Sequence, residues 1–149
     1  MAALDVHHAR VFGRCESTTG IAPFDRLVEQ VMTRPAYNEA RRVFWIVDNG
    51  SSHRGAASVA RPQSKFRRLT LVHGPIHASW LNQIEIYFSI IQRKVLSPND
   101  FAGLDTLAER LLDFQYYWEA TAKPFQWKFT RSDLAILLSK CPTSNRVAA

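Results

Sequence analysis

Residues 73–96 read HGPIHASWLNQIEIYFSIIQRKVL, a loop with proline and glycine that leads into an amphipathic helix. Apolar residues recur at steps of three and four, and this spacing places them on one face of a helix. The residues on this face are Leu81, Ile84, Phe88, Ile91 and Val95. Ser79 is the predicted N-cap. Glu85 falls early in the helix on the opposite face, three residues after Asn82, so a carboxylate is expected near the helix start.

An unbroken apolar run, VFWIV at residues 43–47, precedes this stretch and ends at Asp48. Consecutive β-branched and aromatic residues indicate a strand buried on both faces, as in a parallel sheet. Residues 69–72, LTLV, predict the next strand. Because strands joined through a helix usually run parallel, these segments predict an α/β fold.

The rest of the chain completes one domain, without internal repeats or an interdomain linker. Before the strand at 43–47, the sequence predicts a hairpin over residues 2–16, with its turn near His8-Ala9, and a helix from Pro23 to Arg34. After that strand it predicts a helix from about His53 to Arg61 that is ended by Pro62. The C-terminal part is predicted to hold a long helix through Leu104, Leu107, Leu111, Phe114 and Trp118, and a last helix that begins with a capping box at Thr130–Asp133. The domain is assigned to residues 1–141, and residues 142–149 are expected to form a frayed tail.

The composition is that of a basic globular protein. Of the 149 residues, 46% are hydrophobic and 21% are charged, and the net charge is +6 with a pI near 9.7. This balance favours a folded domain with an anionic partner, nucleic acid first. No apolar run is long enough for a membrane span, and no signal peptide is recognisable. Two distant cysteines provide neither a zinc ligand set nor a disulfide framework, so a reducing compartment is expected.

Basic residues gather in a few segments of the chain. The segments are Arg41-Arg42, Lys65–Arg68, Arg93-Lys94 and Lys123–Arg131. In the last segment aromatic residues alternate with the basic ones, a pattern that suits contact with a nucleic-acid backbone together with base stacking. The alternative, in which the aromatic residues belong to the core and the basic ones are solvated, is equally compatible with the sequence.

Asp48 and Glu85 are candidates for one shared site. Parallel strands end at the same edge of a sheet, and ligands of open α/β sheets bind beside that edge. Asp48 follows the first strand there, and the early position of Glu85 in its helix keeps it near the same edge. Two carboxylates that converge in a basic protein favour a hard divalent cation, Mg²⁺ or Mn²⁺, acting on phosphodiester bonds. Ordinary turn chemistry for Asp48 and a helix-dipole role for Glu85 are the alternatives.

Two long segments resemble a known family. VFWIVDNGSSH (43–53) and LVHGPIHASWLNQIEIYFSIIQRKVLSPNDF (71–101) resemble the bacterial IS630-type transposases, within the Tc1/mariner group of DDE transposases, and residues 4–28 and 124–134 resemble the flanking parts. The resemblance implies an RNase H-like fold in which Asp48 is the second catalytic acid and Glu85 the third. It also implies metal-dependent cleavage of transposon ends, then strand transfer by the freed 3′-hydroxyl group.

One part of the family pattern has no counterpart in this sequence. The first catalytic Asp of the family lies on the first, central strand, which would precede residue 1, and the family's N-terminal helix-turn-helix region is absent as well. The resemblance therefore predicts a C-terminal fragment that lacks this strand, holds two of three metal ligands and is inactive alone. Asp5 is the one nearby acid in a strand, and the resemblance places it on the second strand instead.

Several polar and aromatic residues are weighed as DNA contacts. They are Asn82, His53, Arg93, Lys94, Trp127 and Lys128. Each of them also has a structural alternative. Asn82 would be a helix cap or a surface amide, and His53 a structural histidine at a helix start. The basic residues would be solvated, and the indole of Trp127 would be buried. A zinc site built from His53, His73 and His77 is a further alternative, although His73 and His77 do not share a helix face.

The sequence thus predicts the catalytic domain of an insertion-sequence transposase, with Mg²⁺ or Mn²⁺ as cofactor and DNA, both transposon ends and target, as partner. A homodimer is considered, no membrane partner is expected, and the resemblance implies the bacterial cytoplasm, at the nucleoid when DNA is bound. A non-catalytic DNA-binding or dimerising remnant of a transposase is the main alternative. Further alternatives are a resolvase or RNase H-type nuclease of the same fold, and a zinc hydrolase.

Overall fold

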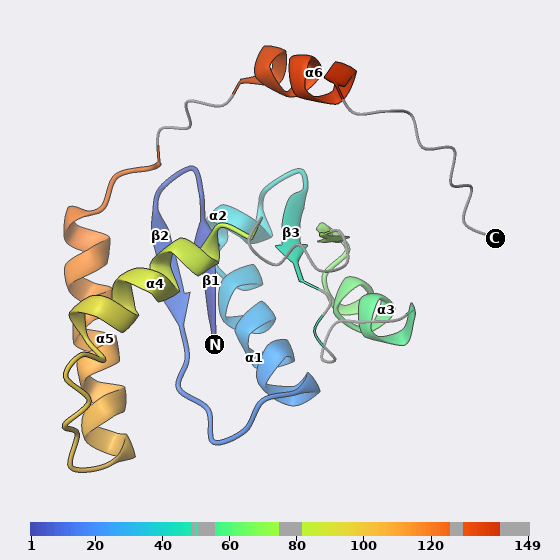
Figure 1. The fold of residues 1–149 in the computed structure, drawn as a ribbon. Helices are drawn as coiled ribbons and strands as arrows, with labels where there is room; N and C mark the ends of the chain where they lie inside the picture. The colour runs from blue at the N-terminus through green and yellow to red at the C-terminus, as the bar shows by residue number, and fades with distance from the viewer. Residues whose placement is uncertain (49, 51–55, 75–81, 126–129, 141–149) are drawn as a thin grey trace.

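The computed structural model describes residues 1–48, 50, 56–74, 82–125 and 130–140 (Figure 1). Both strands and helices occur in these residues, and they alternate from α2 to α4, which agrees with the predicted α/β class. In chain order the elements are β1 (Ala2–Asp5), β2 (Arg10–Gly13), α1 (Ile21–Met32), α2 (Pro35–Asn38), β3 (Val43–Val47), α3 (Ala56–Lys65), β4 (Leu69–His73), α4 (Ile84–Lys94), α5 (Leu104–Thr121) and α6 (Arg131–Lys140). None of these helices has the length and hydropathy that a membrane span needs.

The N-terminal hairpin is confirmed, with β1 and β2 antiparallel and Leu4 opposite Val11. Its turn lacks the glycine that tight hairpins usually contain, and Ala9 adopts a left-handed conformation with φ of 55°. The carboxylate of Asp5 accepts hydrogen bonds from the backbone N–H groups of His7 and His8, at 2.9 and 3.2 Å. The Asp5 side chain therefore stabilises a turn that is otherwise unfavourable, because the turn contains no glycine.

Helices cover the hairpin on both faces. Phe12 packs with Leu27 and Val31 of α1, whereas its neighbour Val11 packs on the other side with Ile84 and further residues of α4 and α5. Successive side chains of a strand point to opposite faces, so these two residues anchor the two layers. The hairpin is the middle layer of an arrangement in which α1 lies on one side and α4 with α5 on the other (Figure 1).

The outer edge of β2 is bonded by side chains of α5. The indole Nε1 of Trp118 donates to the backbone oxygen of Ala9 at 2.9 Å, and the backbone N–H of Gly13 donates to Oε1 of Gln115 at 2.8 Å. A Cβ atom at residue 13 would clash with Oε1 of Gln115, so a side chain there would displace this amide and its hydrogen bond. The long helix thereby covers a strand edge that would otherwise offer free backbone groups.

Strands β3 and β4 form the predicted parallel pair, in register from Val43 opposite Leu69 to Val47 opposite His73. Inward-facing residues of this pair pack against Phe24, Val28 and Met32 of α1. The expectation that the strand at 43–47 is buried on both faces is wrong. Phe44 and Ile46 are 62% and 60% exposed, because among the described residues α1 and α3 cover only one face of this pair.

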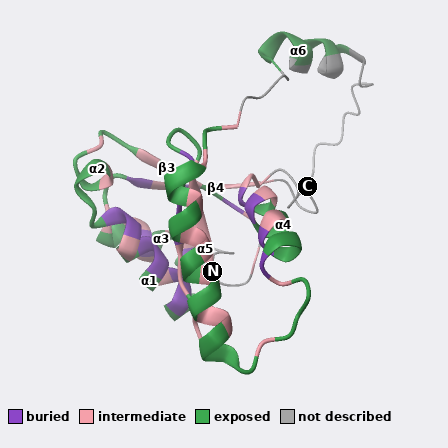
Figure 2. Cartoon of the chain, turned by 90° about the vertical axis from the view of Figure 1, so that its left-hand side faces the viewer, coloured by how far each residue is buried: buried purple, intermediate pink, exposed green. Residues whose placement is uncertain are grey.

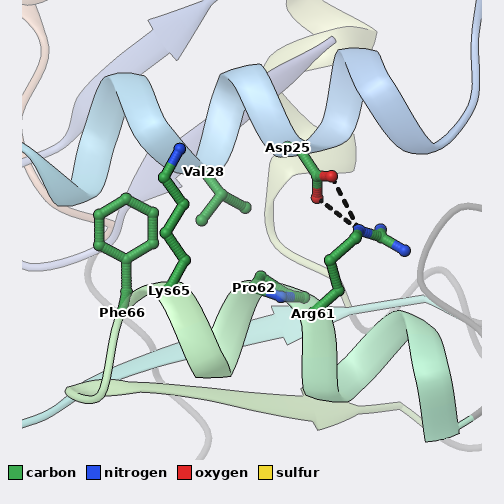
Figure 3. Close-up of a pocket in the computed structure, with 6 residues that line it drawn as sticks. All are labelled: Asp25, Val28, Arg61, Pro62, Lys65 and Phe66. Atoms are coloured by element: carbon green, nitrogen blue, oxygen red, sulfur yellow. Dashed lines mark hydrogen bonds and ion pairs between the residues drawn. The ribbon is translucent and has the colours of Figure 1, made fainter.

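Helix α3 continues through Pro62, although the sequence predicted that it would end there. The proline lacks the N–H that would bond to the carbonyl of Ser58, at a cost of about 3 kcal/mol in a helix interior. Packing offsets this cost, since the proline ring is buried between α3 and α1. Residues of both helices line the shallow hollow beside it in Figure 3: Asp25, Val28, Arg61, Pro62, Lys65 and Phe66. The predicted start of this helix near residue 53 lies outside the described residues.

Ion pairs join α1 to α3 on either side of this hollow. Nε of Arg61 donates to both carboxylate oxygens of Asp25, at 3.0 and 2.8 Å (Figure 3). Nζ of Lys65 donates to Oε1 of Glu29 at 2.9 Å. Both pairs are partly solvated, so each contributes about 0.2–1 kcal/mol. They fix the orientation of α3 against α1 and therefore the position of the β3–β4 pair beneath it.

The later helices agree with the sequence in extent but differ in the residues they bury. Tyr87 lies in the core beside Ile84 and Ile91, whereas the predicted core residue Phe88 is 37% exposed. In α5, Leu104 is exposed and the inner face is only half-buried (Figure 2). The predicted N-cap at residue 79 and the apolar residue 81 lie outside the described residues.

The capping box at the start of α6 is confirmed. The backbone N–H and Oγ1 of Thr130 both donate to Oδ2 of Asp133 at 2.7 Å, and the backbone N–H of Asp133 donates to Oγ1 of Thr130 at 3.2 Å. Aspartate thus fills the place usually taken by glutamate or glutamine. The predicted tail at 142–149 lies outside the described residues.

Within the described residues the strands form two separate sheets, β1–β2 and β3–β4, rather than one. Helix α1 connects them, because its side chains alternate between the two cores: Phe24 and Val28 pack on the parallel pair, and Leu27 and Val31 pack on the hairpin. The observed architecture is α/β, as expected, and the two sheets share one helical layer.

Candidate functional site

Asp48 lies at the carboxyl-terminal edge of the parallel pair, as predicted. The residue before it, Val47, is opposite His73, and the carbonyl of Val47 accepts a hydrogen bond from the backbone N–H of Gly74 at 2.9 Å. Both strands therefore end side by side. Oδ1 of Asp48 accepts a hydrogen bond from the backbone N–H of Gly50 at 2.9 Å, which fixes the half-buried carboxylate over the start of the following loop.

Glu85 is the second residue of α4 and is exposed. Its backbone N–H donates to the carbonyl of Asn82 at 3.0 Å, and Ser89 donates to the Glu85 carbonyl at 2.9 Å. The first turn of a helix carries a partial positive charge, which favours a carboxylate at this position. Glu85 thus lies on the polar side of α4 near its start, as the sequence predicted.

Gln83, between Asn82 and α4, was not singled out from the sequence. Its Oε1 atom is buried and accepts no hydrogen bond from the described residues. A buried carbonyl oxygen without a partner costs about 1–3 kcal/mol, so a cation or a donor at this oxygen would stabilise the fold. In the sequence, only the position of Gln83 two residues before Glu85 could have indicated a role in the site, because a single amide side chain forms no recognisable pattern.

The Asp5 carboxylate is engaged in holding the hairpin. Oδ2 accepts a hydrogen bond from the Tyr37 hydroxyl at 2.6 Å and lies 2.8 Å from Nδ1 of His8, while Oδ1 accepts the two N–H groups of the turn. Burial raises the pKa of Asp5, but the hydrogen bonds from Tyr37 and His8 outweigh it, and the pKa is lowered overall. Asp5 therefore acts as a structural anion between β1 and α2.

The location of Asp5 also separates it from Asp48. Its partner Tyr37 belongs to α2, which precedes the amino-terminal end of β3, whereas Asp48 follows the carboxyl-terminal end. Strand β3, five residues or about 16 Å long, lies between the chain segment that carries Tyr37 and Asp48. In Figure 1, α2 lies beside the turn end of the hairpin. The geometry thus argues against Asp5 as a substitute for the first catalytic acid beside Asp48.

The donor chemistry of these residues fits a hard divalent cation. Two carboxylates, Asp48 and Glu85, come from the strand end and helix start that the site requires. Mg²⁺ and Mn²⁺ take oxygen ligands of this kind and keep waters for phosphate oxygens to replace. Within the described part of the chain, no group of three or more histidine, cysteine, aspartate or glutamate side chains comes together as a metal site.

Of the predicted DNA contacts, Arg93 and Lys94 lie exposed in the last turn of α4, where basic side chains also complement the helix dipole. Asn82 is half-buried before that helix. In the basic and aromatic segment near the C-terminus, Phe125 packs on Trp118 with ring centroids 6.4 Å apart, which supports a core role for that ring. The others lie outside the described residues: His53, Trp127 and Lys128.

The zinc alternative rests largely on residues that the structure does not describe, His53 and His77. Its third member, His73, is the last residue of β4, opposite Val47 in the neighbouring strand. The edge that carries Asp48 therefore also carries this imidazole. A zinc site remains an alternative to be separated from a magnesium site by experiment.

Comparison with known proteins identifies one family. A family model described as DDE superfamily endonuclease matches residues 1–108, which include both sheets, Asp48 and Glu85. No curated protein and no solved structure matches significantly. A DDE superfamily domain implies an RNase H-like fold and a transposase-type nuclease function, and the α/β architecture is consistent with that fold. This chain belongs to the DDE superfamily endonuclease family.

Proposed function

We propose that this chain contributes the second and third acids, Asp48 and Glu85, to the metal site of an IS630-type DDE transposase that cuts and joins transposon DNA. The observation that carries the proposal is the position of Asp48. It follows the parallel strand pair at the edge where the strands end together, within the segment that the DDE family match covers. The bacterial insertion-sequence assignment rests on the resemblance of residues 43–53 and 71–101.

Each residue has a defined task in this proposal. The Asp48 carboxylate, oriented by the Gly50 N–H, and the Glu85 carboxylate would hold the cation. A bound Mg²⁺ or Mn²⁺ supplies an activated oxygen nucleophile and neutralises charge at the scissile phosphate. Arg93 and Lys94 at the far end of α4 would contact the DNA backbone. Asp5 is not assigned a metal-binding role in this proposal, because its carboxylate is committed to Tyr37 and the turn.

The test is Mn²⁺ binding to the full chain, followed by electron paramagnetic resonance and by thermal unfolding. We expect saturable binding and, at about ten times the Kd, a gain of about 1.4 kcal/mol in the free energy of unfolding. Glu85→Gln and Asp48→Asn should each abolish both effects. Asp113→Asn is the matched control, since this exposed carboxylate lies on α5, and it should leave both effects unchanged.

Two outcomes would overturn the proposal. If the unchanged chain shows no saturable Mn²⁺ binding but still binds DNA, the non-catalytic remnant is the correct assignment. If elemental analysis finds zinc bound in proportion to the chain and His73→Ala removes it, the zinc alternative holds instead.

A further inference from the structure

Two arginine pairs that are far apart in the sequence meet at the amino-terminal edge of the parallel sheet. Arg41 and Arg42 directly precede β3, and Arg67 and Arg68 directly precede β4. The backbone N–H of Val43 donates to the carbonyl of Arg68 at 2.8 Å, so the two strand entries lie side by side. Neighbouring strands are about 4.8 Å apart, and four guanidinium groups therefore arise from one small edge of the sheet.

One member of this arginine edge, Arg68, is fixed by the backbone. Its Nη1 donates to the carbonyls of Glu39 and Ala40, at 2.7 and 2.8 Å, and so ties the segment before β3 to the segment before β4. All four arginines are exposed. The edge is thus held in place by one arginine, while the other three are exposed beside it.

The charge of the arginine edge is not balanced within the described residues. Some basic side chains elsewhere in the molecule are paired, such as Arg26 with Glu16 at 2.6 Å and Arg61 with Asp25 at 2.8 Å. In the described part of the chain, no ion pair involves Arg41, Arg42 or Arg67. Like charges this close repel one another, so an anionic ligand at this edge would stabilise it. The excess positive charge of the chain, +6, is consistent with such a ligand.

We propose that the arginine edge binds the sugar–phosphate backbone of duplex DNA without reading its sequence. Guanidinium groups bind phosphate oxygens through paired hydrogen bonds and are the preferred side chains for this contact. The edge lies one strand length, about 16 Å, from the edge that carries Asp48. If the proposed metal site is correct, the DNA held here is a different segment from the one that is cut. Binding at the arginine edge does not itself require that site.

The test measures binding of a fluorescent 30-base-pair duplex to the full chain as a function of salt. The variant is Arg41→Gln/Arg42→Gln/Arg67→Gln, which leaves the structural Arg68 in place. Each lost phosphate contact reduces the slope of log K against log salt by about 0.9, so the slope should fall by about 3 and the affinity at 0.1 M salt by roughly 500-fold. Circular dichroism confirms that the variant is folded.

The matched control removes the same charge elsewhere, in Arg10→Gln/Arg26→Gln/Arg110→Gln, and should change the slope by less than half as much. Equal slopes for the two triple variants would overturn the proposal, because only net charge would then matter. Loss of RNA binding with unchanged duplex DNA binding would overturn it too. The duplex titrations are run in EDTA, without divalent cations, so a failed metal site and a failed arginine edge give different results.

Discussion

Similar apolar residues are buried in the hairpin but exposed in the parallel strand pair. In β2, Val11 and Phe12 are 0% and 2% exposed, whereas Phe44 and Ile46 of β3 are among the most exposed large apolar residues of the chain. Both strands carry apolar side chains on their two faces. The difference is that α1 and α4 enclose the hairpin from two sides, while α1 and α3 cover the parallel pair from one. Burial is therefore set by the neighbouring helices and not by the strand's own sequence.

The largest expected effect comes from the same substitution made in both strands. Phe12→Ala should lower the free energy of unfolding by about 3–5 kcal/mol, because it leaves a cavity between β2 and α1. Phe44→Ala removes an exposed ring and should cost less than about 1 kcal/mol. Urea denaturation followed by circular dichroism measures both. Equal losses would show that the outer face of β3 is covered in solution, and the comparison would fail.

A smaller effect is expected where the hairpin is fastened to α2. Tyr37→Phe removes the hydroxyl that donates to the Asp5 carboxylate and should cost about 1.5–3 kcal/mol at pH 7, as expected for a hydrogen bond to a charged group. The folded pKa of Asp5 lies below its ordinary value of 3.8, since hydrogen bonds to the carboxylate outweigh the effect of burial. The stabilisation is therefore complete above that value and is lost as the pH falls through the lower folded pKa.

The pH dependence distinguishes this bond from simple packing. In native chain and Tyr37→Phe, unfolding curves between pH 7 and pH 2 should converge as Asp5 becomes protonated. A difference that stays constant over this range would mean that the ring environment, and not the charged hydrogen bond, carries the effect. Asp5→Asn should remove the convergence and serves as the control.

The smallest effect is expected on the parallel side, where ion pairs supplement a single covered face. Arg61→Gln breaks the pair with Asp25 and should cost about 0.2–1 kcal/mol in low salt, because both groups are partly solvated. In 1 M salt the cost should shrink toward zero as the charges are screened. Thermal unfolding at the two salt concentrations measures it. A loss above about 2 kcal/mol would show that α3 depends on this pair far more than its exposure implies.

The sequence predicted most of the elements, because local patterns dictate them. Apolar spacing in residues 84–95 and the run at 43–47 gave a helix and a strand where the structure has them. Pro62 misled the prediction of α3, since the burial of its ring beside α1 outweighs the missing backbone hydrogen bond. Tyr87 replaced Phe88 in the core because the direction of α4 relative to the hairpin, which spacing does not reveal, decides which neighbour faces inward.

The candidate site was partly predictable for the same reason. Asp48 was recognised because it follows an unbroken apolar run, and Glu85 because it lies at the start of an amphipathic helix. Gln83 was missed, since a lone amide carries no pattern, and its significance comes from burial. The arginine edge was visible only as two separate basic pairs, because the 26-residue span between Arg41 and Arg67 is closed by the pairing of β3 with β4.

By itself, the sequence determined the class of fold, the strand end that carries Asp48, the helix start that carries Glu85 and the family resemblance, because these follow from residue order and periodicity. Only the tertiary structure decided which strand is enclosed and which is half-covered, that Asp5 serves the hairpin turn through Tyr37, and that four arginines share one edge. The physical reason is that these properties depend on contacts between distant segments. Which faces meet is fixed by how helices pack across sheets, and residue order alone does not specify it.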